Sequence, residues 1–314
     1  MIIIKTIKEL FNIKYPLIQG GMANIATAEF ASAVSNAGAL GLIGSGGNSV
    51  DWVRNEIRKI KTLTNKPFGV NIMLLNPDAP LIAKMVIEEG VKIITTGAGS
   101  PGAYMEMWKE AGIIVVPVIA SVAHALRMER IGADAVVVEG MEAGGHIGRQ
   151  TTMALVPQVV DKVNIPVIAA GGIADYRGVL AAFSLGAKGV QVGTVLLASN
   201  ECPIHQNYKD WVVNAKDNET TVTNWEGKAP VRVFKNEMAV KYIELSKTNP
   251  PFEELEKLTL GSLRKAIFEG NVMEGSFMAG QIAGLVKEIK PVKEIIEAMF
   301  INIDDYKDSI KIMK

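Results

Sequence analysis

The sequence of 314 residues has little of what marks several protein classes. Its single cysteine, Cys202, excludes an internal disulfide and fits a reducing compartment. Its 33 basic and 33 acidic side chains cancel, which gives no support for binding nucleic acid or an anionic membrane through bulk charge. Lysines interrupt MIIIKTIKELF too early for a signal peptide, and no apolar run is long enough to span a membrane. We therefore expect a cytoplasmic protein.

Histidine is also scarce, and its placement argues against metal chemistry. His124, His146 and His205 are scattered without the spacing of metal ligands, so we predict no metal site. None of the apolar runs ends in a lysine suited to a Schiff base, and Cys202 has no neighbour that would activate it as a nucleophile.

The chain does contain eight apolar, β-branched runs. They are continuous rather than alternating, which is typical of parallel strands covered on both faces. Helical segments separate them, and several of these end in glycine. The regular repeat predicts an α/β fold, a (β/α)8 TIM barrel over residues 1–204, with an open doubly wound sheet as the alternative. The runs begin at Pro16, Ala39, Pro67, Lys92, Ile113, Asp134, Pro166 and Gly189.

The repeat ends near residue 200. Residues 205–314 combine mixed polar stretches with three helical patterns, NEMAVKYIELS, ELEKLTLGSLRKAIF and PVKEIIEAMF, and with the glycine-punctuated GSFMAGQIAGL. We expect this C-terminal region of helices and loops to pack over the barrel mouth.

Polar side chains interrupt the apolar runs near their ends. Gln19, Asn71 and Glu139 end three runs, and Gln191 lies inside the eighth. A buried amide without a partner costs about 1–3 kcal/mol, so these groups either bond to one another and to loop backbone or bind a ligand. Because the carboxyl ends of barrel strands form the usual active site, their gathering there favours a polar ligand.

Glycines follow the last two runs. Gly171 and Gly172 end the seventh, and Gly193 precedes Thr194 at the polar end of the eighth. Tight strand-to-helix turns would explain them, but loops at these two positions are the usual phosphate site of a TIM barrel. We therefore predict a phosphate-bearing ligand.

A third glycine cluster imitates a dinucleotide site. Gly97, Gly99 and Gly102 have the G-x-G-x-x-G spacing, but the next run, IIVVPVIAS, ends without the acidic residue that the dinucleotide fingerprint requires. We interpret this stretch as an ordinary glycine-rich loop.

One histidine lies in an unusual setting, the stretch EGMEAGGHIG at residues 139–148. So much bare backbone offers little to hold His146 in a core. It is either an exposed loop residue or a proton donor or acceptor that titrates near neutrality, and we predict the second role.

Taken together, these motifs resemble those of the nitronate monooxygenase superfamily, which consists of FMN-dependent barrels. Within it, the chain is most similar to the flavin-dependent enoyl-acyl-carrier-protein reductases, from about Tyr15 to Ile295. Nitronate oxidisers carry glutamine where this chain has Glu139, which favours the reductase branch. The motifs that carry the likeness are IQGGMA, GVNIMLLNP, EGMEAGGHIG, PVIAAGGIAD, VQVGT and VMEGSFMAGQIAGLVKEIKPV.

The resemblance implies an oxidoreductase that reduces trans-2-enoyl-acyl carrier protein with NADH or NADPH, the last step of fatty-acid elongation. Two alternatives stay open: a nitronate monooxygenase that uses oxygen, and a flavin- or phosphometabolite-binding protein without turnover. The resemblance also implies a homodimer and, in some members, a monovalent cation.

The resemblance further assigns roles to individual residues. His146 would be catalytic and lie over the flavin on the substrate side, and Gly145, Met278 and Gln281 would contact the substrate. The residues expected to bind FMN are Gln19, Gly20, Gly21, Met22, Ala23, Asn71, Glu139, Gly144, Gly171, Gly172, Gln191, Val192, Gly193 and Thr194. An acidic carrier protein would need basic surface residues, for which the sequence offers Arg127, Arg130, Arg149, Lys228, Arg232 and Lys235.

Overall fold

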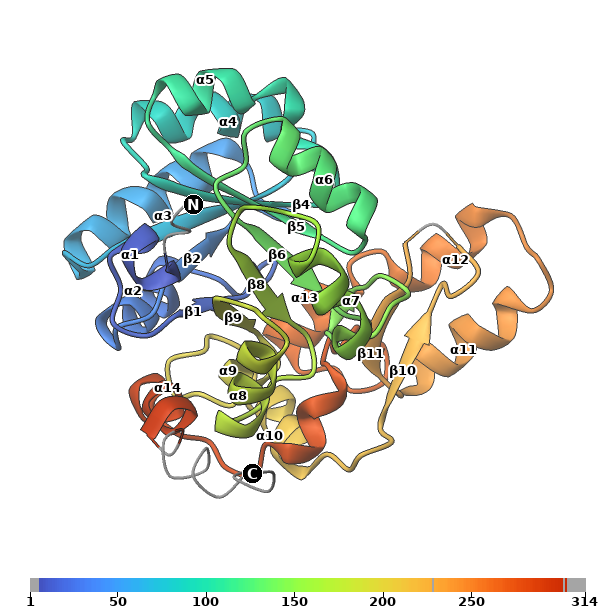
Figure 1. The fold of residues 1–314 in the computed structure, drawn as a ribbon. Helices are drawn as coiled ribbons and strands as arrows, with labels where there is room; N and C mark the ends of the chain where they lie inside the picture. The colour runs from blue at the N-terminus through green and yellow to red at the C-terminus, as the bar shows by residue number, and fades with distance from the viewer. Residues whose placement is uncertain (1–5, 228, 302, 304–314) are drawn as a thin grey trace.

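The computed structural model describes residues 6–227, 229–301 and 303. Its centre is a barrel of eight parallel strands in the order β1-β9-β8-β6-β5-β4-β3-β2, closed by a bridge between Ile18 and Leu40 (Figure 1). Each strand falls in one of the eight apolar runs, so the predicted (β/α)8 TIM barrel is confirmed. The strands are β1 (Leu17–Gln19), β2 (Gly41–Gly44), β3 (Phe68–Met73), β4 (Ile93–Gly97), β5 (Ile114–Ile119), β6 (Val136–Glu139), β8 (Val167–Ala170) and β9 (Gly189–Val192).

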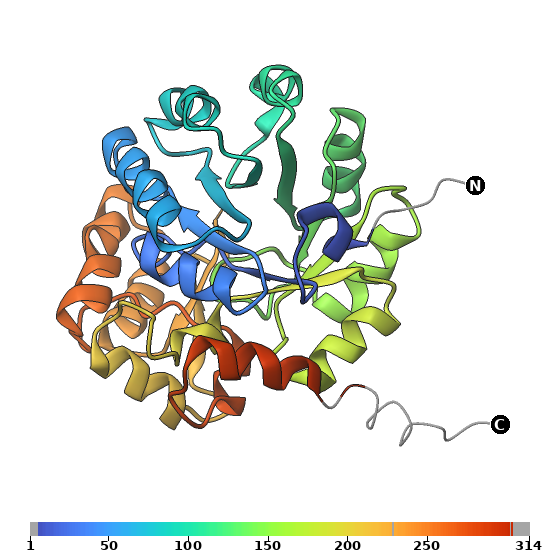
Figure 2. The ribbon, with the colours of Figure 1, turned by 90° about the vertical axis from the view of Figure 1, so that its left-hand side faces the viewer.

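A ring of helices covers the outside of the barrel. The helix directly after β9 is only one turn long, and the ring is completed by α14, which lies beside α8 and α2 (Figure 2). There the ring of Phe300 stacks on Tyr15 at 5.0 Å between centroids. The helices of the ring are α2 (Ala28–Asn36), α3 (Val50–Leu63), α4 (Ala79–Glu88), α5 (Met105–Glu110), α6 (Val122–Arg130), α7 (Thr152–Val160), α8 (Tyr176–Ser184), α9 (Thr194–Leu197) and α14 (Val292–Ile301).

The barrel interior is apolar below its mouth. Inward side chains of the strands, among them Ile18, Val116 and Ile168, form one buried cluster with Ile7 and Phe11 of α1 (Ile7–Phe11). A capping box fixes the start of α1, because the Thr6 hydroxyl accepts from the Glu9 backbone N–H. The short helix therefore helps to fill the interior, and it left no periodic pattern in the sequence.

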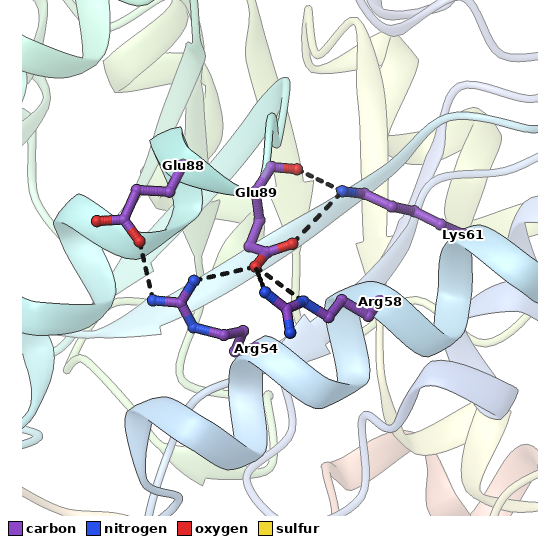
Figure 3. Close-up of polar contacts among 5 residues, drawn as sticks. All are labelled: Arg54, Arg58, Lys61, Glu88 and Glu89. Atoms are coloured by element: carbon purple, nitrogen blue, oxygen red, sulfur yellow. Dashed lines mark hydrogen bonds and ion pairs between the residues drawn. The ribbon is translucent and has the colours of Figure 1, made fainter.

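An ion-pair network joins α3 and α4 on the outer surface (Figure 3). The carboxylate of Glu89 accepts from Arg54 Nη1 at 3.0 Å and Arg58 Nη2 at 2.7 Å, and Lys61 Nζ lies 3.8 Å away. Arg54 also donates to Glu88 at 2.8 Å. The guanidinium of Arg58 is the main reason why the pKa of Glu89 lies below its usual value. The opposite face of α3 is apolar and packs on the barrel.

The C-terminal region forms a second, small antiparallel sheet with strand order β10-β11-β7. Its strand β7 (Gly145–His146) belongs to the loop that connects β6 to α7, and β7 pairs with β11 (Figure 1). The helical pattern ELEKLTLGSLRKAIF is interrupted, since Gly261 has φ of +74° and separates α12 from α13. The elements of this region are α10 (Gln206–Asn214), β10 (Thr220–Thr223), β11 (Val231–Phe234), α11 (Glu237–Ser246), α12 (Phe252–Thr259), α13 (Ser262–Arg264), a π-helical turn (Lys265–Glu269) and a 3-10 helix (Gln281–Leu285).

Two further expectations concern individual segments. The G-x-G-x-x-G stretch follows β4 and enters a 3-10 turn (Pro101–Ala103) and the six-residue α5, which agrees with an ordinary βα loop. No helix among the described residues combines the length and apolar character needed to cross a membrane.

Candidate active site

Three of the expected polar residues share the inner face of the barrel mouth. Along β3, β6 and β9, the neighbours of Asn71, Glu139 and Gln191 point outward into the clusters beneath the helices, so alternation turns these three side chains inward. Asn71 is paired, because its Nδ2 donates to Thr95 Oγ1 at 2.8 Å. Glu139 and Gln191 lie level with each other on either side of Ala170.

Gln19 differs from this group. Its strand alternation places it on the other face of β1, where its Oε1 accepts from the Leu42 backbone N–H at 3.3 Å. One half of the amide therefore adds a side-chain bond across the seam between β1 and β2, where backbone bonds join Gln19 N to Leu40 O and Leu40 N to Leu17 O. Its Nε2 is buried and has no hydrogen-bond partner among the described residues.

Unpaired polar atoms lie near the carboxyl ends of three barrel strands, and the one on Gln191 faces the mouth. Gln191 Oε1 and Gln19 Nε2 are two of the three buried side-chain atoms without a partner in the described part of the chain; the third is Thr96 Oγ1. Each such atom costs about 1–3 kcal/mol unless something bonds to it. The mouth is thus built for a polar ligand rather than for internal pairing.

Glu139 is the strongest electrostatic anomaly of the site. Its carboxyl makes no recorded hydrogen bond or ion pair within the described residues, and desolvation raises its pKa to about 8. The residue keeps some surface open toward the mouth, although protein surrounds its carboxyl. At neutral pH the carboxyl is therefore mostly uncharged.

Glycines open the rim of the mouth. Gly171 and Gly172 have φ of +89° and +76°, and a Cβ on Gly171 would lie 2.9 Å from Gly140 O. Gly21 allows Asn71 to approach, because a Cβ there would overlap the Asn71 side chain. These positions leave bare backbone at the rim.

The loops after β1 and β9 meet beside these glycines. Gly20 N donates to Val192 O at 2.8 Å, and Met22 N donates to Gly20 O. Met22 Sδ lies 3.5 Å from where a Cβ on Gly193 would stand. Ala23 continues the β1 loop and lies near Gly46. The structure thus brings the β1 and β9 groups of expected residues together.

His146 stands on the two-residue strand β7. Val231 of β11 pairs with it, and Ile147 N donates to Pro230 O at 3.0 Å. The residue is exposed on one side, while protein around the other side lowers the imidazole pKa from its usual 6.5 through burial. It is therefore neutral at pH 7 and open to solvent.

A segment from Phe277 to Gln281 lies against the same loop. Its Met278 Sδ is 3.4 Å from the Cβ position of Gly145, and Gln281 N donates to Glu142 O at 2.9 Å. Gly144 allows this approach, because a Cβ there would lie 2.7 Å from Ala279 C. The three expected substrate residues thus lie on one side of the mouth.

The Phe277–Gln281 segment is fixed at both ends. Gly280 N donates to Thr194 Oγ1 at 2.9 Å, and the buried Tyr208 hydroxyl donates to Met278 O at 2.8 Å. Burial raises the pKa of Tyr208, so its hydroxyl stays protonated as a donor. Tyr208 carries no sequence signal of this role, and reasoning from the sequence missed it.

Two other supporting residues also escaped the sequence analysis. The Glu142 carboxylate accepts from Thr152 N and Oγ1, each at 3.0 Å, and so holds the loop to the start of α7.

Arg232, offered by the sequence as a surface contact, is instead 4% exposed. Of the other basic candidates, Arg149 is exposed and its guanidinium lies 4.9 Å over the Trp225 ring, while Lys228 is outside the described residues.

The described residues hold no cluster of three or more His, Cys, Asp or Glu side chains suited to a metal ion.

Comparison with known proteins places this site in a family. A profile described as nitronate monooxygenase matches residues 5–302. A structure of FabK from Thermotoga maritima superposes with a TM-score of 0.95 at 47% identity and covers 98% of this chain and 99% of that one. A probable nitronate monooxygenase of Staphylococcus saprophyticus is 35% identical, over 89% of this chain and 92% of its own.

A Mycobacterium tuberculosis protein is 32% identical over 94% of both chains; it is named (3aS,4S,5R,7aS)-5-hydroxy-7a-methyl-1-oxo-octahydro-1H-indene-4-carboxyl-CoA dehydrogenase. A structure described as nitroalkane oxidase from Streptomyces ansochromogenes is 24% identical with a TM-score of 0.84, which supports the fold alone. The match of the family profile to nearly the whole chain shows that this protein belongs to the nitronate monooxygenase family of oxidoreductases.

Proposed function

We propose that this protein is an FMN-dependent enoyl-acyl-carrier-protein reductase. It takes electrons from NADH or NADPH and reduces a trans-2-enoyl-acyl carrier protein to the saturated acyl form. The observation that carries the proposal is the 47% identity, over 98% of this chain, to FabK, an enoyl-acyl-carrier-protein reductase II. Glu139 supports the same branch, since glutamine is the residue expected there in nitronate oxidisers.

The residues of the mouth fit FMN. Within the described residues the amide oxygen of Gln191 is unpaired and faces the mouth, where it matches a hydrogen-bond donor on the polar edge of a flavin ring. Gln19, whose side chain lies on the other face of β1, remains a proposed contact at the end of that strand. Gly171 and Gly172 present backbone without side chains after β8, and Thr194 carries a hydroxyl after β9, so we propose that these two loops bind the phosphate. FMN supplies hydride transfer, which no side chain performs. The other residues proposed to bind it are Gly20, Gly21, Met22, Ala23, Asn71, Glu139, Gly144, Val192 and Gly193.

The reduction adds a hydride at the β-carbon of the enoyl thioester and a proton at its α-carbon. His146 can assist the protonation of the α-carbon, because its neutral imidazole offers an N–H or holds a water. Its exposed side exchanges protons with solvent. The mostly uncharged Glu139 adds no negative charge that would oppose the developing enolate.

The substrate side of the mouth suits a long acyl arm. Gly145 presents bare backbone, and Met278 and Gln281 belong to the segment that lies against it. We propose that residues 1–204 bind the flavin and that the region after residue 204 caps this channel, apart from α14, which completes the helical ring of the barrel. Arg149 and Lys235 are exposed and remain candidates for contact with the acidic carrier. A homodimer and a stimulating monovalent cation are further parts of the proposal.

Nitronate oxidation is the second candidate, favoured by the name of the staphylococcal relative. In that reaction His146 would remove a proton from a nitroalkane, and no pyridine nucleotide would be consumed. The two functions separate in a steady-state assay. We expect oxidation of NADH or NADPH that depends on crotonyl-CoA or an enoyl-acyl carrier protein. Oxygen uptake on a nitroalkane without pyridine nucleotide, and no turnover of any enoyl thioester, would contradict the proposal.

A further inference from the structure

The position of His146 depends on a minimal piece of secondary structure. β7 has two residues, and its register with β11 consists of two pairs, Val231 with His146 and Arg232 with Gly145. Gly145 adopts φ of +79°, a conformation that glycine enters and leaves easily. A strand this short needs further attachment if the imidazole is to keep one place.

Arg232 supplies that attachment with its side chain. Its Nε donates to Met141 O at 3.0 Å, near the other end of the loop that connects β6 to β7. Its Nη1 donates to Thr220 Oγ1 of β10 at 3.2 Å. One residue thus fixes both ends of the loop, Gly145 through its backbone register and Met141 through its guanidinium.

This arrangement carries an energetic cost. Arg232 is 4% exposed, and within the described residues no carboxylate forms an ion pair with it. Burial lowers the pKa of the guanidinium, and the charge of Glu142 opposes that shift. An apolar side chain of similar volume would fill the space without the desolvation penalty, so the bonds to Met141 and Thr220 are the specific contribution of arginine.

A second buried cation provides the contrast. Lys209 is 7% exposed, and its Nζ donates to Ser199 O at 2.7 Å and Asn200 O at 3.2 Å, on the chain that leaves α9. Among the described residues it also fixes backbone carbonyls without an ion pair, and it makes no bond to the loop that carries His146. Loss of Lys209 should therefore cost stability alone.

We propose that Arg232 is a positioning residue for His146: its guanidinium ties Met141 to the β10–β11 pair and so holds the imidazole at the barrel mouth. The inference rests on the proposed catalytic role of His146. It predicts that Arg232 acts on turnover without touching the flavin or the substrate.

The test compares four variants of the flavin-loaded protein. In Arg232→Met we expect kcat with NADH and crotonyl-CoA to fall about 100-fold, the size of effect that a misplacement of about 1 Å produces, with KM and flavin content nearly unchanged. Hydrogen exchange of residues 141–148 should accelerate. Arg232→Lys should restore part of kcat through one bond to Met141, and Thr220→Val should show a smaller loss.

Lys209→Met is the matched control, with a lower melting temperature and wild-type kcat and loop exchange. Unchanged exchange in Arg232→Met, or equal kcat losses in Arg232→Met and Lys209→Met, would overturn the positioning role. If Arg232→Met proves insoluble, wild-type exchange and kcat in both Arg232→Lys and Thr220→Val would overturn it as well. Failure of the wild-type protein to turn over any enoyl thioester, with exchange still dependent on Arg232, would contradict the proposed function alone.

Discussion

Two polar regions of this molecule differ in whether their polar groups have partners. On the outer surface, Glu89 gathers Arg54, Arg58 and Lys61 around one carboxylate (Figure 3), and each charge has a partner. At the barrel mouth, Gln191 has a buried oxygen that finds no partner in the described part of the chain, and the carboxyl of Glu139 has a raised pKa. Pairing at the surface serves the fold, whereas unpaired polar groups at the mouth cost stability and become useful only when a ligand bonds to them.

The largest effect should come from the mouth. His146→Ala should lower turnover of an enoyl thioester by about 10²–10⁴-fold, the usual contribution of a general acid or base, while FMN stays bound. The check is steady-state kinetics with the flavin content read from absorbance. His124→Ala is the control, because that histidine lies half-buried on α6, a helix of the outer ring. Equal activity of the two variants would remove His146 from the mechanism.

The next effect concerns the proposed phosphate site. Gly172→Leu should yield protein largely free of FMN, and its affinity for FMN should approach that for riboflavin. Gly112→Leu is a matched control, since Gly112 has φ of +69° against +76° at Gly172 but lies in the turn before β5. Both should lose about 1–2 kcal/mol of stability from the left-handed backbone. Equal flavin retention in the two variants would argue against the site.

A smaller effect is expected from the buried carboxyl. The pKa of Glu139 is about 8 in the fold against 4.5 as its ordinary value, so the folded chain binds an extra proton between these limits. Its contribution to stability is complete below pH 4.5 and is lost as the pH rises through 8. Glu139→Gln should therefore gain stability relative to the flavin-free wild type between pH 5 and 8. A difference between the urea midpoints of the two proteins that stays constant across that pH range would contradict the raised pKa of Glu139.

The smallest effect should come from the paired region. Glu89→Gln should destabilise the fold by only about 1 kcal/mol, because its partners Arg58 and Lys61 lie in solvent and surface ion pairs contribute little. The pKa of Glu89 is lowered, so its contribution is present above pH 4.5 and disappears as the pH falls through the folded-state value. Thermal unfolding at pH 7 and pH 3 tests both the small destabilisation at neutral pH and its loss at low pH. Loss of flavin or turnover in this variant would break the contrast between surface and mouth.

The sequence predicted the barrel well, because continuous apolar runs such as PVIAAGGI report burial on both faces directly. It also predicted that Asn71, Glu139 and Gln191 would meet, since strand ends share one mouth. It could not predict that Gln19 would bond across the barrel seam, or that Arg232 would be buried. Those outcomes depend on contacts between segments distant in the chain, such as Arg232 with Met141, which leave no local pattern.

The central claim is that an enoyl thioester, rather than oxygen acting on a nitronate, is the oxidant of the reduced flavin. The most direct measurement is the flavin absorbance under anaerobic conditions, first with NADH or NADPH and then with crotonyl-CoA or an enoyl-acyl carrier protein. We predict that the pyridine nucleotide bleaches the flavin and that the thioester rapidly restores the oxidised spectrum. A flavin that stays reduced with every enoyl thioester, in a protein that consumes oxygen on a nitroalkane without pyridine nucleotide, would contradict the claim.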